Sequence, residues 1–240
     1  MQLRSGEKKL LERDGAAAVY SATEVEFVVD PAVRGRGIGT GLLEEILEMS
    51  DPTVKIWAHG DHPAARALAA SHGFAPVRRL LQLRAPVNRN SAVETPAAET
   101  PANTFRPGAD DAAWLELNSR AFASHPEQGS VCKADLQELM REPWFDAEDF
   151  LVLREGDALI GFCWLKVEEP VGEFYVVGVD PDRQGDGLGR RLMHAGFARL
   201  AARGIRIAAL YVESDNVAAV ALYRSLGFSD HSLDIQYART

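Results

Sequence analysis

Residues 173–189 read Glu-Phe-Tyr-Val-Val-Gly-Val-Asp-Pro-Asp-Arg-Gln-Gly-Asp-Gly-Leu-Gly, an apolar run followed by a glycine-rich turn. The β-branched and aromatic residues of 174–179 predict a strand, which the following Asp-Pro pair ends. The glycines of 185–189 let the backbone turn into a helix expected over 188–203. Because the first N–H groups of a helix lack partners and its dipole favours negative charge, we expect this turn to bind a phosphate or pyrophosphate.

Two other phosphate-binding loops do not fit this stretch. A P-loop requires a lysine after its second glycine, and none follows here. A dinucleotide-binding loop requires Gly-x-Gly-x-x-Gly, but the sixth position counted from Gly185 is Arg190. The pattern Gln184-x-x-Gly187-x-Gly189 resembles instead the acyl-CoA pyrophosphate loop of the GNAT superfamily of N-acetyltransferases. A tight strand-to-helix connection without a ligand remains the alternative at this point.

The composition narrows the class of protein. The 240-residue chain is 46% hydrophobic, as is normal for one large or two ordinary folded domains. Its formal net charge of -9 argues against a nucleic-acid partner. Cys132 and Cys163 are too few for a disulfide framework or a thiolate zinc site, so we expect two packing residues in a cytoplasmic protein without a metal. We expect no membrane partner, because no apolar stretch approaches the roughly 20 residues of a membrane span and residues 1–13 lack the apolar core of a signal peptide.

The chain contains an internal repeat. Residues 28–31 (Val-Val-Asp-Pro) and 34–39 (Arg-Gly-Arg-Gly-Ile-Gly) match residues 178–181 and 184–189 at a constant offset of 150. Further on, a Gly-Phe pair at 73 matches another at 227, at an offset of 154. Such a pattern indicates two duplicated units.

The first half reads as part of a unit. Hydrophobic periodicity predicts strands over 24–29, 54–58 and 74–84 and helices over 38–49 and 63–71. We expect residues 1–22 to be too few for the strands and helices that precede the corresponding strand in the second half. The repeat is therefore either truncated, or the sequence starts late.

Residues 85–103 lack helical or strand periodicity, carry three prolines and are expected to form a linker. The second half reads as a complete unit. A short strand over 104–106 precedes helices over 110–122, with Asp110 as its cap, and 133–141. Strands over 150–154 and 158–166 form a hairpin that leads to the central strand. After the glycine-rich turn and its helix come a strand over 208–212, a helix over 217–226 and a strand over 232–238.

A second signature follows in the right order. Asn216-x-x-Ala219-x-x-Leu222-Tyr223-x-x-x-Gly227-Phe228 resembles a second GNAT superfamily pattern. Asn216 is placed to cap the helix, and Tyr223 falls on the same helical face two turns later. An ordinary capped helix with a buried tyrosine is the alternative, but two signatures in order favour the superfamily.

Four further strings, residues 121–129, 144–146, 172–173 and 210–216, make the resemblance more specific. They are similar to the mycothiol synthase (mycothiol acetyltransferase) family, tandem-GNAT enzymes of actinobacteria. The match covers nearly all of the second half. In the first half it is confined to the loop at Arg34, residues 57–60 and the Gly-Phe pair at 73. This family usually has a fuller first domain.

The resemblance implies an α/β fold with a mixed sheet and two GNAT repeats. It places a partial, non-catalytic repeat at 1–84, a linker at 85–103 and a catalytic domain at 104–240. It also implies acetyl transfer from acetyl-CoA to the cysteinyl amine of desacetylmycothiol, a cysteine amide of glucosaminyl-inositol. An α-amino group with a pKa of about 7.7–8 needs only modest help to lose its proton.

On this resemblance Glu173 is the general base, directly or through one water, and Tyr223 protonates the leaving thiolate. N–H groups around Val177 and Val179, on a strand that splays from its neighbour in this superfamily, stabilise the oxyanion. The implied substrate-binding residues are Glu127, Lys166, Glu173 and Tyr211. The implied acetyl-CoA-binding residues of the second half are Val177, Gly178, Val179, Gln184, Gly185, Asp186, Gly187, Leu188, Gly189, Arg190, Asn216, Val217, Ala218, Ala219, Val220 and Ala221.

Plainer interpretations stay open for two of these residues: Lys166 as a solvated charge and Tyr211 as strand packing. The first half looks catalytically empty, because the offsets place Thr23 opposite Glu173 and Ala69 opposite Tyr223. We expect it to stabilise the other half and to bind acetyl-CoA at most. The residues concerned are Phe27, Val28, Val29, Gly35, Arg36, Gly37, Ile38, Gly39 and Thr40.

Two alternatives to the function remain. One is a GNAT enzyme that acts on another small primary amine or on a protein N-terminus. The other is an acyl-CoA-binding sensor without catalysis, which the pair Glu173 and Tyr223 argues against for the second half. We expect a monomer with small-molecule substrates.

Overall fold

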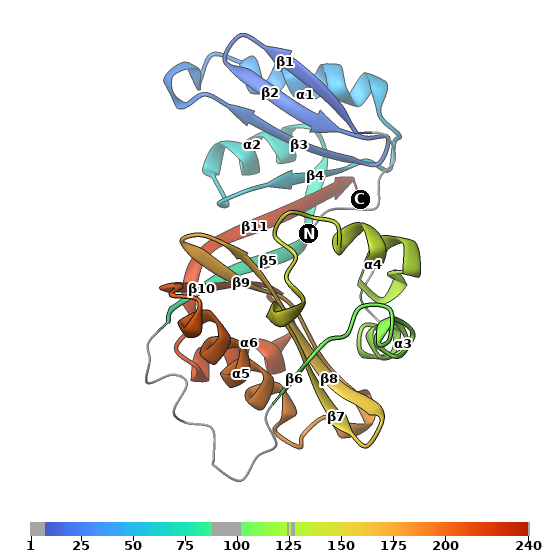
Figure 1. The fold of residues 1–240 in the computed structure, drawn as a ribbon. Coiled ribbons are helices and arrows are strands. Elements are labelled where there is room, and N and C mark those ends of the chain that lie inside the picture. Colours follow the sequence, from blue (N-terminus) through green and yellow to red (C-terminus); the bar gives the residue numbers. More distant parts are fainter. Residues whose placement is uncertain (1–7, 88–101, 124, 126–127, 240) are drawn as a thin grey trace. The chain divides into compact units, whose positions relative to one another are not determined.

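The computed structural model describes residues 8–87, 102–123, 125 and 128–239 (Figure 1). Its chain forms two compact units. The N-unit comprises the described residues of 2–82 together with 212–220 and 230–239, and the C-unit comprises those of 83–211 together with 221–229. Compactness therefore divides the chain differently from the sequence repeat, because the last strand and the start of the last helix fall in the N-unit.

The N-unit is a mixed sheet with two helices. Its strand order is β1 (Lys9–Arg13), β2 (Ala16–Tyr20), β3 (Glu24–Val29), β4 (Lys55–Ala58) and β11 (Ser229–Arg239), and only the β3–β4 pair is parallel. A short 3-10 helix (Pro31–Val33) precedes α1 (Ile38–Met49), and α2 (Pro63–Ser71) follows β4. β5 (Phe74–Pro86) contributes residues to both units.

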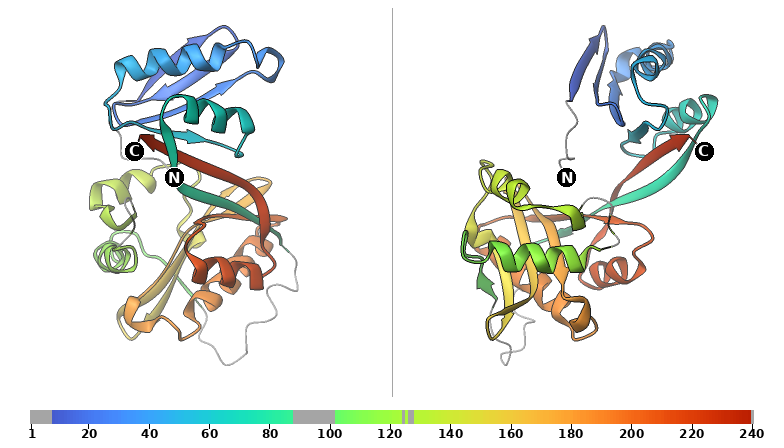
Figure 2. Two further views of the ribbon diagram at one scale, coloured as in Figure 1. Left: turned by 180° about the vertical axis from the view of Figure 1, so that it is seen from behind. Right: turned by 90° about the vertical axis from the view of Figure 1, so that its right-hand side faces the viewer.

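The N-unit core lies between its helices and one face of its sheet (Figure 2). Val25 of β3 and Ile46 of α1 have no exposed surface, and Ile235 and Tyr237 of β11 are buried with them. Because side chains alternate along a strand, Glu24 and Glu26 are on the other face of β3. The last strand of the chain is thus part of the N-unit core.

The C-unit is a larger mixed sheet, in the order β10 (Ile207–Glu213), β9 (Val171–Val179), β8 (Ala158–Glu168), β7 (Phe150–Glu155) and β6 (Asn103–Thr104). Its helices are α3 (Asp111–Ala121), α4 (Lys133–Leu139), α5 (Leu188–Ala202) and part of α6 (Val217–Ser225). Trp114 of α3 and Leu136 of α4 pack into an aromatic core with Phe150 and Trp164. On the other face of β9, Phe174 packs against Phe197 of α5, so helices cover both faces of the sheet.

One prediction about the N-terminus is wrong. Residues 9–20 form the hairpin β1–β2, so the start of the chain does supply two strands before β3. The signal was the Asp14-Gly15 pair, since Gly15 has a φ of +73° at the turn between the strands. Within the described residues, no helix precedes β3.

Three smaller expectations also differ from the structure. The carboxylate of Asp110 does not cap α3, because it accepts hydrogen bonds from Arg106 and Arg154. Cys163 is buried as expected, but Cys132 is exposed just before α4 and is not a packing residue. β5 continues to Pro86 and β6 begins at Asn103, so both ends of the predicted linker lie in strands, and residues 88–101 lie outside the described part.

We predict that Gly196→Ala destabilises the protein. A Cβ atom at this position of α5 would clash with the ring of Phe174 and lie 3.3 Å from Cys163 Sγ. Overpacking of this kind costs about 1–3 kcal/mol, more than the ~1 kcal/mol that alanine gains over glycine in a helix. The free energy of unfolding in urea measures the effect. In α1, Gly41→Ala is the matched control and should stabilise by ~0.5–1 kcal/mol, because nothing lies within 4 Å of its Cβ position; equal effects of the two changes would contradict the packing argument.

Candidate functional site

Two central strands of the C-unit, β9 and β10, separate after Glu173. The parallel pairing of β9 with β10 covers only Val171–Glu173 and Ile207–Ala209, although both strands continue beyond it. On its other side, β9 shifts register against β8 between Trp164 and Leu165, which leaves Tyr175 as the extra residue of a bulge. Residues 174–179, which include Val177, Gly178 and Val179, therefore present an edge without a β10 partner among the described residues. A ligand with amide groups is able to pair with such an edge.

The predicted pyrophosphate turn follows β9 directly. Asp180 accepts a hydrogen bond from the N–H of Asp182 and so starts a short 3-10 helix (Pro181–Arg183). Gly185 (φ +93°) and Gly187 (φ +78°) then have backbone conformations that glycine adopts without strain. Gly187 immediately precedes α5, which begins at Leu188. No side chain caps the N-terminus of this helix. The N–H groups of the first turn are thus available to an anion.

Arg120 of α3 forms ion pairs with two carboxylates that precede this turn. Its guanidinium donates two hydrogen bonds to Asp180, at 2.6 and 3.1 Å, and one to Asp182, at 2.7 Å. Arg183 makes ion pairs with Asp186 and with Glu155. These contacts neutralise carboxylates that would otherwise repel a bound pyrophosphate. Arg120 was not predicted from the sequence, since its partners lie 60 residues further along the chain.

Glu173 is half-buried at the point where β9 and β10 diverge. Burial raises the pKa of its carboxyl group, because desolvation disfavours the charged form, and the nearby Lys166 partly offsets this rise. Lys166 is the register partner of Glu173 on β8, so the two side chains share a face. A carboxylate with a raised pKa is a stronger base than an ordinary one.

Tyr223 lies on α6, half-buried, with its ring 6.0 Å from that of Phe228. Burial raises its pKa to about 12, so the phenol keeps its proton at neutral pH. Arg190 of α5 donates a hydrogen bond to Ser225 Oγ at 2.8 Å, and a Cβ atom at Gly189 would lie 3.3 Å from Leu222. The first turn of α5 and the second half of α6 are therefore packed together, which fixes Tyr223 relative to the predicted pyrophosphate turn.

The remaining predicted residues of the second half are spread more widely. Asn216 Oδ1 accepts a hydrogen bond from the N–H of Ala219, so the predicted cap is confirmed, but residues 216–220 belong to the N-unit and Ala221 to the C-unit. Lys166 forms an ion pair with Glu168 at 2.9 Å. Tyr211 is 41% exposed on β10. Glu127 lies outside the described residues.

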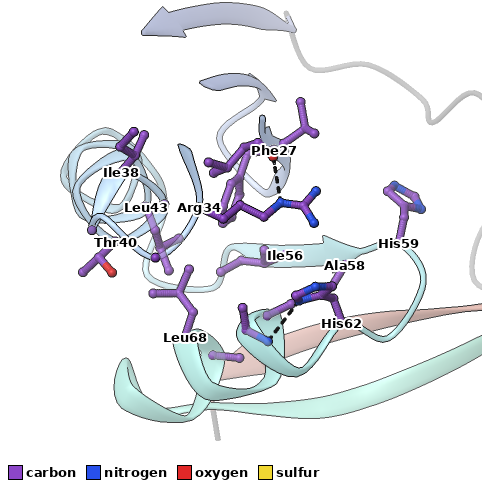
Figure 3. Close-up of a pocket in the computed structure, with 18 of the residues that line it drawn as sticks. Phe27, Arg34, Ile38, Thr40, Leu43, Ile56, Ala58, His59, His62 and Leu68 are labelled. Carbon is purple, nitrogen blue, oxygen red and sulfur yellow. Dashed lines mark hydrogen bonds between the residues drawn. The ribbon is translucent and has the colours of Figure 1, made fainter. Parts of the chain in front are cut away.

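The N-unit has a similar turn beside a cavity. The parallel pairing of β3 with β4 ends at Glu26 and Trp57, and Gly35 (φ +77°) and Gly37 (φ +82°) lead into α1. A cavity of about 380 Å³ opens between this turn, β4 and α2 (Figure 3). All but one of the predicted N-unit residues line it, the exception being the exposed Arg36: the lining ones are Phe27, Val28, Val29, Gly35, Gly37, Ile38, Gly39 and Thr40.

Three basic side chains, Arg34, His59 and His62, also line this cavity, and the two histidines were not predicted from the sequence. Arg34 comes from the loop before α1 and donates a hydrogen bond to the carbonyl of Val29 at 3.0 Å (Figure 3). His62 immediately precedes α2 and accepts a hydrogen bond from the N–H of Ala64. The sequence did contain a signal, because the offset that pairs the two Gly-Phe motifs places His62 opposite Asn216.

The N-unit carboxylate that corresponds to Glu173 is in a different state. Strand pairing matches Glu26, not Thr23, to Glu173, because each is the last residue paired across its parallel strands. Glu26 accepts a hydrogen bond from His59, which lowers its pKa, and Asp234 and Glu26 raise the pKa of His59 to about 10. The pairing of β2 with β3 has no register shift, so β3 lacks the bulge of β9. The N-unit thus has a cavity but no basic carboxylate.

No group of three or more His, Cys, Asp or Glu side chains that could hold a metal ion occurs in the part of the chain that the structure describes. None of the helices in that part is long and apolar enough to cross a membrane.

The chain is similar to known acetyltransferases over most of its length. Residues 11–74 and 113–228 match the acetyltransferase (GNAT) family. A mycothiol acetyltransferase of Clavibacter michiganensis subsp. michiganensis is 52% identical over 230 residues, which are 93% of this chain and 74% of the relative. Another from Thermobispora bispora is 47% identical over 225 residues, 89% of this chain and 75% of the relative.

Solved structures agree on the fold. A GCN5-related N-acetyltransferase from Sphaerobacter thermophilus superposes with a TM-score of 0.76 at 24% identity, covering 93% of this chain and 76% of that one. A tandem GNAT protein from the clavulanic acid biosynthesis pathway gives a TM-score of 0.68 at 19% identity, covering 93% of this chain and 78% of that one. The predicted α/β fold with two GNAT repeats is thereby confirmed.

The chain therefore belongs to the acetyltransferase (GNAT) family and, within it, to the family of the mycothiol acetyltransferases. It is an acetyl-CoA-dependent N-acetyltransferase, which confirms the expected class of enzyme.

We predict that Arg120→Met raises the KM for acetyl-CoA. The substitution leaves Asp180 and Asp182 uncompensated beside the predicted pyrophosphate turn. Because the pairs are partly exposed, each contributes only 0.2–1 kcal/mol, and we expect a rise of about two- to fivefold. Steady-state kinetics at low and high salt measure it, and high salt should shrink the difference. Arg141→Met, at an exposed position after α4, is the matched control; an equal rise there would show that only net charge matters.

Proposed function

We propose that this enzyme transfers the acetyl group of acetyl-CoA to the cysteinyl amine of desacetylmycothiol, the last step of mycothiol biosynthesis. The observation that carries the proposal is the position of Glu173, a half-buried carboxylate where two strands separate, on the strand that leads into the predicted pyrophosphate turn. The names of the close relatives supply the identity of the acceptor.

The reaction begins with proton removal from the amine. Glu173 accepts this proton directly or through one water, and its raised pKa matches it to an amine with a pKa of about 7.7–8. The neutral amine then attacks the thioester carbonyl. Backbone N–H groups of residues 177–179, on the edge without a β10 partner, stabilise the negative charge that develops on the carbonyl oxygen.

Collapse of the tetrahedral intermediate releases the thiolate of CoA. Tyr223 donates its proton to this sulfur, since its phenol is protonated at neutral pH. Acetyl-CoA binds along residues 177–179, with its pyrophosphate at residues 184–190 and further contacts from residues 216–221. The polar pseudodisaccharide is bound by Glu127, Lys166, Glu173 and Tyr211.

The first repeat binds acetyl-CoA without catalysing transfer. Its cavity is lined by the turn before α1 and by Arg34, which suit a pyrophosphate. However, ion pairing with His59 lowers the pKa of Glu26, which makes this carboxylate a poor base. In this proposal residues 1–84 form the non-catalytic repeat, 85–103 the linker and 104–240 the catalytic repeat. The enzyme is a cytoplasmic monomer.

The decisive experiment is mass-spectrometric detection of an added acetyl group on desacetylmycothiol beside a panel of simple amines and peptide N-termini. Glu173→Gln and Tyr223→Phe should each lower kcat by about 10²- to 10⁴-fold, with acetyl-CoA affinity nearly unchanged. In the wild-type protein kcat/KM should fall as pH falls through the raised pKa of Glu173, since the base must be ionised. This limb should be absent in Glu173→Gln.

If another amine is acetylated in preference to desacetylmycothiol, the proposed acceptor is wrong. If Glu173→Gln keeps full turnover, Glu173 is not the general base. A loss of acetyl-CoA affinity equal to the loss of rate would give both residues structural roles instead.

We predict that the full chain binds one acetyl-CoA in each repeat. Ala65→Trp places an indole in the N-unit cavity, which Ala65 lines, and should abolish one of the two binding events while turnover persists. Isothermal titration calorimetry of the wild type and the variant measures the stoichiometry. Ala67→Trp, at an exposed position of α2 outside this cavity, is the control and should bind as the wild type does. A single binding event in the wild type that survives in Ala65→Trp would contradict cofactor binding by the N-unit.

A further inference from the structure

The ammonium group of Lys166 contacts two side chains of the C-unit and lies on the same face as a third. Its Nζ atom is 2.9 Å from Glu168 Oε2 and 5.5 Å from the centroid of the Trp144 ring. Lys166 is also the register partner of Glu173 across β8 and β9. Its side chain is only 27% exposed, so it is not the freely solvated charge that a lysine near a strand end usually is.

Trp144 is itself held firmly. It lies between α4 and a short 3-10 helix (Ala147–Asp149), and its ring packs 5.7 Å from Trp164 and 5.3 Å from Tyr175. Trp164 has no exposed surface, and Tyr175 follows Glu173 by two residues on β9. The face of Trp144 is therefore fixed by two neighbours and attracts a cation through the ring quadrupole.

The charge of a lysine has a defined position only where neighbouring side chains restrict its flexible stem. Its flexible stem carries about 2 kcal/mol of rotamer entropy, and its charge is compact and strongly hydrated. Without a support, the ammonium group samples positions in water, where its effect on a half-buried carboxylate is weak. The contacts with Trp144 and Glu168 restrict Lys166 to the side of the sheet on which Glu173 lies.

Few charged groups surround Glu173. Lys166 and Glu168 approach from β8, Tyr175 lies on β9, and Glu142, from the segment after α4, lies near Tyr175. The paired residue on β10 is Ala209, which carries no charge. Burial raises the pKa of Glu173, Glu168 raises it further, and Lys166 lowers it. Lys166 is thus the cation on β8 that opposes the effect of burial on this carboxylate.

We propose that Trp144 is a positioning residue that holds the Lys166 ammonium group beside Glu173, so that this carboxylate is ionised when the substrate amine arrives. The inference rests on the proposed role of Glu173 as the base. In the step concerned, the amine N–H bond breaks, its proton goes to a carboxylate oxygen of Glu173, and its electron pair forms the bond to the thioester carbon. Lys166 and Trp144 exchange no proton in this step.

The test is the pH profile of kcat/KM for desacetylmycothiol, measured on the full chain. Lys166→Met should move the acid limb up by about one pH unit, because it removes an opposite charge within reach of a carboxylate. Trp144→Leu should move the limb in the same direction by about half as much. Trp144→Phe keeps an aromatic face and should stay close to the wild type. Glu168→Gln should move the limb down, since it removes a charge that raises the pKa of Glu173.

The control is Lys133→Met, which removes the same charge at an exposed position of α4 and should leave the profile in place. The substrate amine is the same in every assay, so differences between variants report the enzyme. A merely structural role of Trp144 would lower kcat/KM equally at every pH, and that result would overturn the inference. So would a shift in Lys166→Met with none in Trp144→Leu.

The outcomes separate this inference from the proposed function. If Glu173→Gln loses turnover but Trp144→Leu does not shift the acid limb of the kcat/KM profile, Glu173 remains the proposed base and the role of Trp144 is rejected. Full turnover in Glu173→Gln would reject both. Should Trp144→Leu fail to fold, Trp144→Phe and Lys166→Met still differ: the acid limb should stay in place in Trp144→Phe and move up in Lys166→Met, and a shift in Trp144→Phe as large as that in Lys166→Met would overturn the inference.

Discussion

The structure of the C-unit depends on an interrupted sheet. Backbone N–H and C=O groups that lose a strand partner need another one, since leaving them unpaired in a buried site is costly. Here the pairing of β9 with β10 stops at Glu173, and a bulge at Tyr175 turns the rest of β9 against β8. The interruption creates an edge suited to the amides of a pantetheine arm and places Glu173 at its start. A ligand bound along this edge would supply the hydrogen-bond partners that β10 does not provide.

The two repeats show that binding geometry and chemistry are separable. Both have an Asp-Pro turn, two glycines with positive φ and a helix that begins immediately afterwards. They differ in the charge environment of one carboxylate. Burial strengthens Glu173 as a base, whereas the bond with His59 weakens Glu26. A duplicated unit can thus have a similar turn and a cavity beside it although the carboxylate that matches Glu173 is held in an ion pair.

Local sequence patterns predicted much of this structure. The helices at 38–49 and 63–71 and the strand at 24–29 have the expected bounds, because glycine, proline and apolar periodicity act over a few residues. The β1–β2 hairpin was missed because its strands are short and mixed in character. The match of Glu26 to Glu173 was missed because the parallel pairing ends at different distances from the two Asp-Pro turns, so the constant sequence offset does not relate these residues. The contacts of Arg120 and Trp144 could not be predicted, since each meets its partners only through tertiary packing.

The last strand has a consequence for how this protein is made. β11 pairs with β4 and places Ile235 and Tyr237 in the core of the N-unit. A ribosome translates β4 long before it reaches β11, so the first repeat waits, with its sheet incomplete, until β11 has been made. The first repeat can therefore complete its fold only after most of the second repeat has been translated.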